Sequence, residues 1–360
     1  MFGKIFSSKP SETPLEIKTT ITELLESYRS DSFPHGVLAV CENLKISTIK
    51  TAHTVALTLP FPCAGELQVL ADQLTEELAC QVSFNIDLDV KAVRQHGITK
   101  VANIIAISSG KGGVGKSTTT VNLAYALIAE GAKVGVLDAD IYGPSIPTML
   151  GLKGHKPQLL GGKFMLPPIA NKLYAMSIDF LIDADDATVW RGPMASKAFG
   201  QLLTETAWPE LDYLLIDMPP GTGDIQITLA QQVPVAAATV VTTPQDIALI
   251  DAIKGIAMFK KVAVPVLGII ENMSYHICDN CGHHSHLFGQ DGGKDIAEKY
   301  QTNLLGQLPL DITIRENADL GQPSVFENST SDISQKYRKI ARNMAAQLYL
   351  QLDRRSVGKK

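Results

Sequence analysis

Cysteine is scarce in this sequence, and long apolar runs are missing altogether. Five cysteines stand among 360 residues, and an odd number in a chain of this size is not a disulfide framework. The first ten residues carry no apolar run of signal-peptide length. The longest apolar run, Val233–Val241, is far too short to span a bilayer. We therefore expect a cytoplasmic protein with reduced thiols, without disulfides or a membrane span.

An excess of positive charge is also missing. Lys and Arg number 32 against 37 Asp and Glu, which gives a net charge of -5, whereas nucleic-acid-binding surfaces are basic. Hydrophobic residues make up 45% and charged residues 19% of the chain, which is a globular composition. The length favours two domains. We expect neither a nucleic acid nor a membrane as a partner.

The first part of the chain predicts a small α+β domain over residues 15–90. Residues 1–14 are rich in Ser, Lys, Pro and Thr, which is typical of a flexible terminus, and the polar residues 91–100 predict a linker. Cys41 and Cys80 stand in apolar patterns, so we expect them in the core. The apolar spacing predicts a helix, two strands, a helix and a strand, in this order: Pro14–Tyr28, Gly36–Val40, Thr54–Leu59, Leu67–Leu78 and Val82–Val90.

Residues 101–352 alternate short apolar runs with helical stretches, and a basic tail follows at 353–360. Nearly continuous apolar runs are typical of parallel strands that helices cover on both faces. We therefore expect a doubly wound, mostly parallel α/β sheet. Polar residues end every run, and ligands of such sheets bind at the carboxyl ends of the strands. The runs are Ile104–Ile107, Val134–Leu137, Leu214–Ile216, Thr239–Val241 and Val266–Ile270.

The first run leads into a phosphate-binding motif. Residues 110–117 read Gly-Lys-Gly-Gly-Val-Gly-Lys-Ser, which satisfies G-x-x-x-x-G-K-[ST] between a strand and a helix. Such glycines let backbone N–H groups point at one anion, and the helix N-terminus adds partial positive charge. The motif predicts that Lys116 reaches the β- and γ-phosphates of ATP, that Ser117 binds Mg²⁺, and that Thr118 donates near the α-phosphate. The rest of the predicted cradle is Gly110, Lys111, Gly112, Gly113, Val114 and Gly115.

Later runs end in further candidates for nucleotide chemistry. Asp138 and Asp140 follow the second run, and Asp217 ends the third, at the Walker B position. Carboxylates there can hold the shell of Mg²⁺ or orient the attacking water. Gly221 can bring a backbone N–H to the γ-phosphate, and Asn272, after the last run, is placed to recognise the base.

Cys278 and Cys281 form a C-x-x-C pair, which supplies only two of the four ligands that a closed zinc site or a [4Fe–4S] cluster needs. Three solutions are open. Nearby histidines (His276, His283, His284 and His286) could complete a zinc site, the pair could be a redox dithiol, or two chains could each give two thiolates to one shared cluster.

The combined motifs resemble the Mrp/ApbC branch of the SIMIBI class of P-loop ATPases. The proteins of this branch are ATP-binding iron–sulfur cluster carriers. The resemblance rests on the phosphate loop with its extra lysine, on C-x-x-C, and on segments 138–145, 218–224, 242–245 and 271–274. It covers residues 101 to about 350. Residues 15–90 weakly resemble the MIP18-like domain often found in front, in which Cys63 matches a loop cysteine; we expect Cys63 to be a buried structural residue.

This resemblance implies roles that the spacing alone does not give. Lys111 would act across a homodimer on the partner's nucleotide, and Asp140 would position water in switch I. Cys278 and Cys281 would hold a [4Fe–4S] cluster between two subunits, for transfer to apo iron–sulfur proteins. ATP hydrolysis would accompany this carriage.

A different class of ATPase is the alternative. Partition and septum-site ATPases position themselves on DNA or a membrane, and one with a structural zinc site at the C-x-x-C would share most of these motifs. Such proteins use a basic surface or an amphipathic C-terminal helix. Residues Tyr337–Leu352 have helical spacing, with Ile340, Met344 and Leu348 on one face. A helix packed on its own domain has the same pattern.

Overall fold

The computed structural model describes residues 14–181, 192–278 and 280–357. The chain divides into two units, Met1–Asp89 and Val90–Lys360. The expected flexible terminus lies outside the described residues except for Pro14. Of the expected basic tail, residues 353–357 continue the last helix and 358–360 lie outside the described residues. In the described parts of the chain, no helix has the length and apolarity needed to cross a bilayer.

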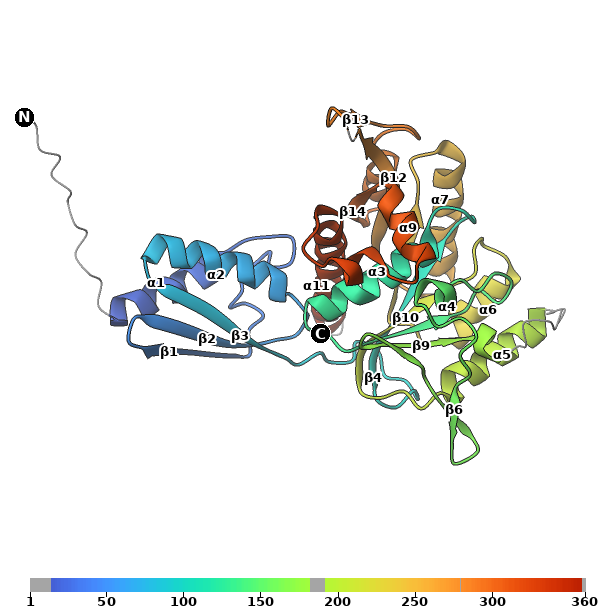
Figure 1. Cartoon of the computed structure of the whole chain (residues 1–360), viewed down its shortest axis with the longest axis horizontal. Coiled ribbons are helices and arrows are strands. Elements are labelled where there is room, and N and C mark those ends of the chain that lie inside the picture. The colour runs from blue at the N-terminus through green and yellow to red at the C-terminus, as the bar shows by residue number, and fades with distance from the viewer. Residues whose placement is uncertain (1–13, 182–191, 279, 358–360) are drawn as a thin grey trace, which may run out of the picture. The chain divides into compact units, whose positions relative to one another are not determined.

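The first unit has two helices beside a three-stranded sheet (Figure 1). Strand β1 pairs antiparallel with β2, and β2 pairs parallel with β3. The side chains of β2 alternate between buried and more exposed positions, so one face of the sheet carries the core. The order of elements is the predicted one: α1 Pro14–Ser27, β1 Asn43–Ile49, β2 Ala52–Leu59, α2 Ala64–Leu78 and β3 Gln81–Leu88.

The strand predicted at Gly36–Val40 is wrong. These residues form turns, and the first strand begins only at Asn43. Gly36 has a φ of 98°, which is a left-handed conformation that breaks an extended run. Val37 is buried, and its N–H donates to the Leu25 carbonyl near the end of α1. Its apolar character therefore reflects a packed turn.

The cysteines of the first unit differ in burial. Cys63 is fully buried just before α2, as expected for a structural residue. Cys41 and Cys80 are only half-buried, so their assignment to the core is wrong. Both lie in short connections that flank a strand, where a side chain of apolar sequence context can still reach the surface.

The second unit is a doubly wound sheet with helices, which confirms the predicted fold class (Figure 1). The strand order is β13-β12-β11-β4-β10-β5-β9-β8, with β14 beside β12. Pairs among β14, β12, β11, β4, β10, β5 and β9 are parallel, and β8 and β13 pair antiparallel. The chain extends to both sides of β4, so the carboxyl end of β4 is the switch point at which ligands bind in such folds.

The elements of this unit are bounded as follows. The strands are β4 Val101–Ser109, β5 Val134–Asp138, β6 Gln158–Leu160, β7 Phe164–Leu166, β8 Ile169–Ala170, β9 Leu173–Ser177, β10 Leu211–Asp217, β11 Ala237–Thr242, β12 Val266–Ile277, β13 His284–Ser285 and β14 Asn303–Pro309. The α-helices are α3 Lys116–Ala129, α4 Ile146–Met149, α5 Gly192–Glu205, α6 Asp224–Gln232, α7 Asp246–Lys261, α8 Gly292–Lys299, α9 Ile312–Asp319, α10 Ser324–Glu327 and α11 Asp332–Val357; a 3₁₀ turn spans Ile178–Phe180.

Residues 91–100 are grouped with the second unit. The Val93 N–H donates to Asn103 Oδ1 at 2.9 Å, and Asn103 Nδ2 donates to the Lys91 carbonyl at 3.0 Å. Arg94 donates to the Val235 carbonyl at 2.9 Å. This polar segment is therefore held along the second unit by hydrogen bonds.

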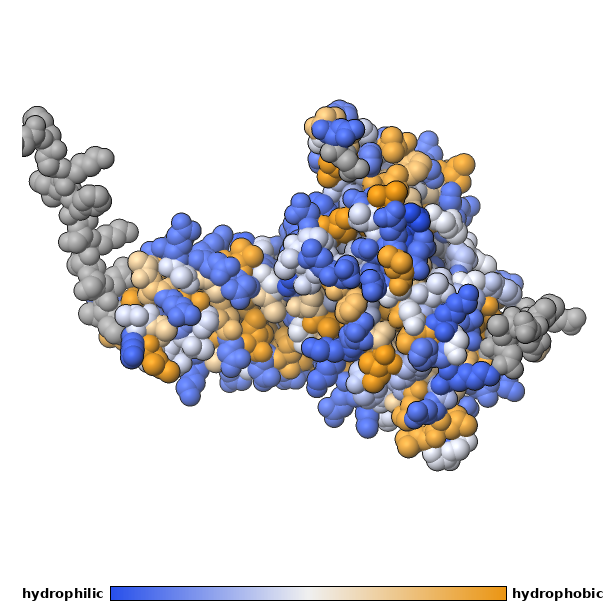
Figure 2. Space-filling model, in the orientation of Figure 1, coloured by the Kyte–Doolittle hydropathy of each residue, from blue (hydrophilic) through white to orange (hydrophobic). Residues whose placement is uncertain are grey.

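The β6–β7 hairpin carries apolar side chains on its surface (Figure 2). Leu159, Leu160 and Phe164 are exposed around a turn in which Gly161 and Gly162 have positive φ.

Candidate functional site

The phosphate loop connects the end of β4 to the start of α3. Gly113 and Gly115 have φ values of 82° and 79°, which glycine adopts without a steric penalty. Gly110 lies against the Asp251 backbone, where a Cβ atom would collide. The loop encloses a cavity of about 210 Å³, lined by Ser109, Lys111, Gly112, Gly113, Gly115, Lys116, Ser117, Thr118, Asp140, Ser145, Met149 and Pro220. The sequence therefore builds an anion-sized cradle at the switch point of the sheet.

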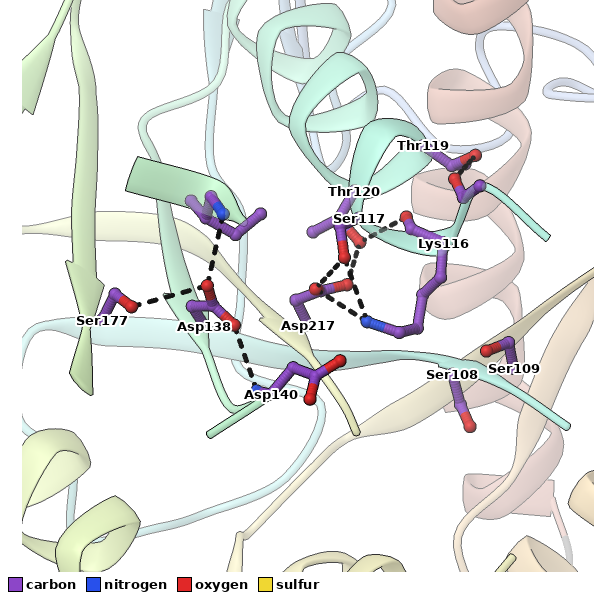
Figure 3. A network of polar contacts seen from close by, with 12 residues as sticks. Ser108, Ser109, Lys116, Ser117, Thr119, Thr120, Asp138, Asp140, Ser177 and Asp217 are labelled. Atoms are coloured by element: carbon purple, nitrogen blue, oxygen red, sulfur yellow. Dashed lines mark hydrogen bonds and ion pairs between the residues drawn. The ribbon is translucent and has the colours of Figure 1, made fainter. Parts of the chain in front are cut away.

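Asp217 is the centre of the polar network in this cavity (Figure 3). Its side chain is fully buried at the end of β10. Lys116 Nζ lies 2.7 Å from Asp217 Oδ2, and Ser117 Oγ donates to the same oxygen at 2.6 Å. Thr120 Oγ1 donates to Oδ1 at 2.7 Å. One carboxylate thus holds the lysine and the hydroxyl that the motif assigns to phosphate and Mg²⁺.

Asp138 and Asp140 lie beside this network, at the end of β5 (Figure 3). Asp138 is buried, and its carboxylate accepts the backbone N–H groups of Asp140 at 3.0 Å and Ile146 at 3.2 Å. Burial, and then the charge of Asp217, raise the pKa of Asp138 to about 8. Asp138 therefore shapes the loop and does not point a free carboxylate into the cavity.

Asp140 is half-buried and lines two cavities. One is the phosphate cavity, and the other, of about 1010 Å³, lies between the Pro219–Asp224 segment, α5 and α6. Burial raises the pKa of Asp140 above its ordinary value. A carboxylate between the phosphate cavity and a large open cavity is well placed to meet water.

The other predicted nucleotide residues have the following places. Lys111 and Thr118 are half-buried on the cavity wall, and Val114 is buried beneath the loop. The Gly221 N–H donates to the Ser109 carbonyl at 3.0 Å. Asn272 Nδ2 donates to the Val114 carbonyl at 2.9 Å. In this state both Gly221 and Asn272 are bonded to the backbone of the loop region.

Thr120 and Gln226 are site residues that the sequence did not predict. Thr120 stands three residues after Ser117 on one face of α3, and this spacing was a usable signal for a second hydroxyl on Asp217. Gln226 Nε2 donates to Ser108 Oγ at 2.6 Å. No sequence signal links those two residues, because α6 and β4 are distant in the chain.

The cysteine pair lies in a hairpin at the far end of β12. Strand β13 pairs back on β12, and the Cys278 N–H donates to the His283 carbonyl at 3.0 Å. The Gly282 N–H donates to the Cys278 carbonyl at 2.8 Å. Cys278 is half-buried and Cys281 is exposed. We call the part with Cys278, Cys281 and Gly282 the cysteine turn.

Three of the neighbouring histidines make other contacts. His276 Nδ1 lies 3.2 Å from the Leu310 carbonyl oxygen, and His286 Nδ1 lies 3.0 Å from that of Ser274. The His284 ring stacks on Tyr275 at 5.4 Å between ring centroids. Within residues 14–181, 192–278 and 280–357, no three His, Cys, Asp or Glu side chains form a group that could hold a metal ion. At this hairpin, the described part of one chain therefore offers two thiols, but not a complete ligand set.

Comparison with known proteins agrees with this geometry. The sequence profile of the NUBPL iron-transfer P-loop NTPases, of the ParA group, matches residues 100–345. The iron-sulfur cluster carrier protein of Escherichia coli (strain K12) is 51% identical over 350 residues, which are 95% of each chain. The iron-sulfur cluster transfer protein NUBPL of Mus musculus is 47% identical over 257 residues, or 71% of this chain and 80% of that one.

A solved structure shows the same fold. The nucleotide-binding protein of Archaeoglobus fulgidus, in complex with ADP, is 37% identical with a TM-score of 0.59. The match covers 67% of this chain and 93% of that chain. Together, the profile, the full-length relative and the fold show that the chain belongs to the NUBPL iron-transfer family of P-loop NTPases.

Proposed function

We propose that the protein binds and hydrolyses ATP and carries a [4Fe–4S] cluster between two copies of its chain for delivery to apo iron–sulfur proteins. The observation that carries the proposal is the cysteine turn, which offers two thiolates directly after the strand that contacts the phosphate loop. A [4Fe–4S] cluster takes four thiolates, so two chains are needed. The relatives named as cluster carrier and cluster transfer proteins support this cargo.

The ATP-binding part of the proposal follows from the groups that surround the phosphate cavity. The glycine cradle and Lys116 suit the β- and γ-phosphates. Ser117 Oγ and the Asp217 carboxylate offer the oxygen ligands that Mg²⁺ prefers, and bound Mg²⁺ would neutralise phosphate charge. Lys116 would then exchange its ion pair with Asp217 for the phosphates. We assign Asp140 to positioning the attacking water.

The dimer is the second part of the proposal. Lys111 lies on the wall of the phosphate cavity, and we assign it to the nucleotide held by a second copy, as the resemblance of the phosphate loop implies. Two copies brought together in this way would each contribute one cysteine turn. We place the delivery in the cytoplasm, because reduced thiols are needed to hold the cluster.

Reconstitution tests the cargo. After anaerobic incubation with iron and sulfide, wild type should hold about four iron and four sulfide per two chains. The Cys278→Ala/Cys281→Ala variant should hold none. The Cys41→Ala/Cys80→Ala variant is the matched control, since its cysteines are half-buried in the first unit, and it should load like wild type. Stoichiometric zinc in place of iron would refute the proposal.

A transfer assay tests the link to ATP. Loaded protein should pass its cluster to an apo [4Fe–4S] enzyme at different rates without nucleotide, with ADP and with ATP. Equal rates in all three conditions would show that nucleotide state does not act on the cluster.

A further inference from the structure

Strand β12 lies between the phosphate loop and the cysteine turn and contacts both. Asn272 lies in it next to the phosphate loop, and Cys278 follows directly after its end. Cys278 is six positions after Asn272, which corresponds to roughly 20 Å of extended chain. The contacts along this stretch show where it is fixed and where it can bend.

At the phosphate loop the contact is close. Asn272 Nδ2 donates to the Val114 carbonyl at 2.9 Å, and a Cβ atom on Gly115 would collide with the same nitrogen. The Met273 Cε atom would lie 3.7 Å from that Cβ atom. Because a phosphate loop turns its N–H groups toward the anion, its carbonyl groups face outward, and one of them is held by Asn272. Closure of the loop on a phosphate would therefore move Asn272.

A bend follows immediately. Met273 has a φ of 55°, a left-handed conformation that is unfavourable for a residue other than glycine. The pairing of β12 with β14 also shifts register between Glu271 and Tyr275. Unusual backbone of this kind persists only where neighbouring contacts hold it.

Glu271 supplies those contacts. Its side chain is fully buried. Ser274 Oγ donates to its Oε1 at 2.6 Å, and Gln307 Nε2 from β14 donates to the same oxygen at 2.8 Å. Its Oε2 accepts the Gly293 N–H at the start of α8. Glu271 thus fixes one side of the bend to two other elements.

Beyond the bend the strand is tied to the cysteine turn. His286 Nδ1 contacts the Ser274 carbonyl at 3.0 Å, and β13 pairs with His276 and Ile277. The Cys278 N–H then donates to the His283 carbonyl. A rotation at Met273 would therefore be carried to the cysteines by the paired hairpin.

We propose that residues 271–274, the relay segment, transmit the state of the phosphate loop to the cysteine turn within one chain, with Met273 as the pivot. Asn272 senses the loop, Glu271 and Ser274 brace the bend, and the hairpin moves the thiols. This inference rests on the proposed function, because it links ATP to the cluster ligands. Asn272 and Met273 are positioning residues in it.

The test follows the thiols of the cluster-free full-length chain. Iodoacetamide alkylation of Cys278 and Cys281 is timed by peptide mass spectrometry, with and without Mg²⁺ and a non-hydrolysable ATP analogue. In wild type we expect the analogue to change the rate at one cysteine about fivefold or more, the size of an ordinary coupling between sites. Met273→Gly frees the pivot but keeps the Asn272–Val114 bond. It should bind a fluorescent ATP analogue as wild type does and lose most of the change in rate.

Ala263→Gly is the matched control. Ala263 has a φ of 55° just before the other end of β12, so this variant also places glycine at a left-handed position, and it should behave like wild type. An unchanged nucleotide effect in Met273→Gly would overturn the proposal, and so would a wild type without any effect. Cluster loading is measured separately. Thiols that respond to nucleotide but bind no iron would refute the cargo and leave the relay intact.

Discussion

Asp217 shows how one buried carboxylate organises a nucleotide site. It accepts from Lys116, Ser117 and Thr120, which are all on the first turns of α3. The buried charge is stable there because a cation and two hydroxyl groups surround it. The same contacts place the lysine and the serine at the edge of the phosphate cavity.

Replacing this carboxylate should therefore impair turnover. We expect Asp217→Asn to lower kcat for ATP hydrolysis by about 100-fold or more, a usual loss when a charge-organising group is removed. Asp212→Asn is the control, since Asp212 is on the same strand but does not line the phosphate cavity, and its carboxylate accepts the Lys133 N–H at 2.7 Å. Steady-state ATPase assays compare the two, and equal kcat values would contradict this role.

Asp138 makes the stability of the nucleotide-free protein depend on pH. Burial and the charge of Asp217 raise its pKa from 3.8 to about 8. The folded state therefore binds this proton more tightly than the unfolded chain does. The stabilisation that Asp138 provides is complete at pH values below its pKa in the unfolded chain. It is lost as the pH rises through its pKa in the folded protein.

Urea unfolding in EDTA can measure the contribution of Asp138 to the free energy of unfolding. Between about pH 6 and pH 8, the free energy of unfolding of wild type should fall by about 1 kcal/mol per pH unit relative to Asp138→Asn, which cannot titrate there. Parallel pH profiles of the two proteins would show that Asp138 is ionised throughout.

At the scale of elements, α11 and α3 are joined through Glu130. This residue follows α3 and is fully buried, and it accepts from Arg338 Nε at 2.7 Å and from Arg342 Nη1 at 2.8 Å. The predicted stripe of Ile340, Met344 and Leu348 is also buried. The C-terminal helix is therefore packed on its own domain along this stripe.

Breaking this ion pair should be costly. Glu130→Ala leaves two nearly buried guanidinium groups without their carboxylate, so we expect a loss of about 3–5 kcal/mol in the free energy of unfolding. Arg315→Ala removes an exposed pair with Asp319 and should cost less than about 1 kcal/mol. Chemical denaturation measures both, and equal losses would refute the buried role of Glu130.

The elements also differ in how far the sequence alone predicts them. The phosphate loop and the apolar strands were predictable because their signals are local. The long-range contacts of the relay segment were not, because Glu271 meets Gly293 and Gln307 only after distant segments pair. The strand predicted at Gly36–Val40 is wrong for a different reason. Its local signal is ambiguous, because a packed turn and a strand can share one apolar pattern.

At the scale of the whole molecule, the ligand count decides how a cluster can be held. The cysteine turn of one chain supplies two thiolates, and the histidines next to it that contact Leu310 and Ser274 are held by those carbonyl groups. We therefore propose that a cluster with four thiolate ligands is shared with a second chain. The likeness of residues 15–90 to a MIP18-like domain stays a prediction.

Native mass spectrometry of the reconstituted protein tests the shared cluster most directly. We predict a complex of two chains that carries one [4Fe–4S] cluster, and no cluster on single chains. Mixed complexes of one wild-type chain and one Cys278→Ala/Cys281→Ala chain should lose the cluster. A single chain that holds a complete cluster or a zinc ion would contradict the shared site.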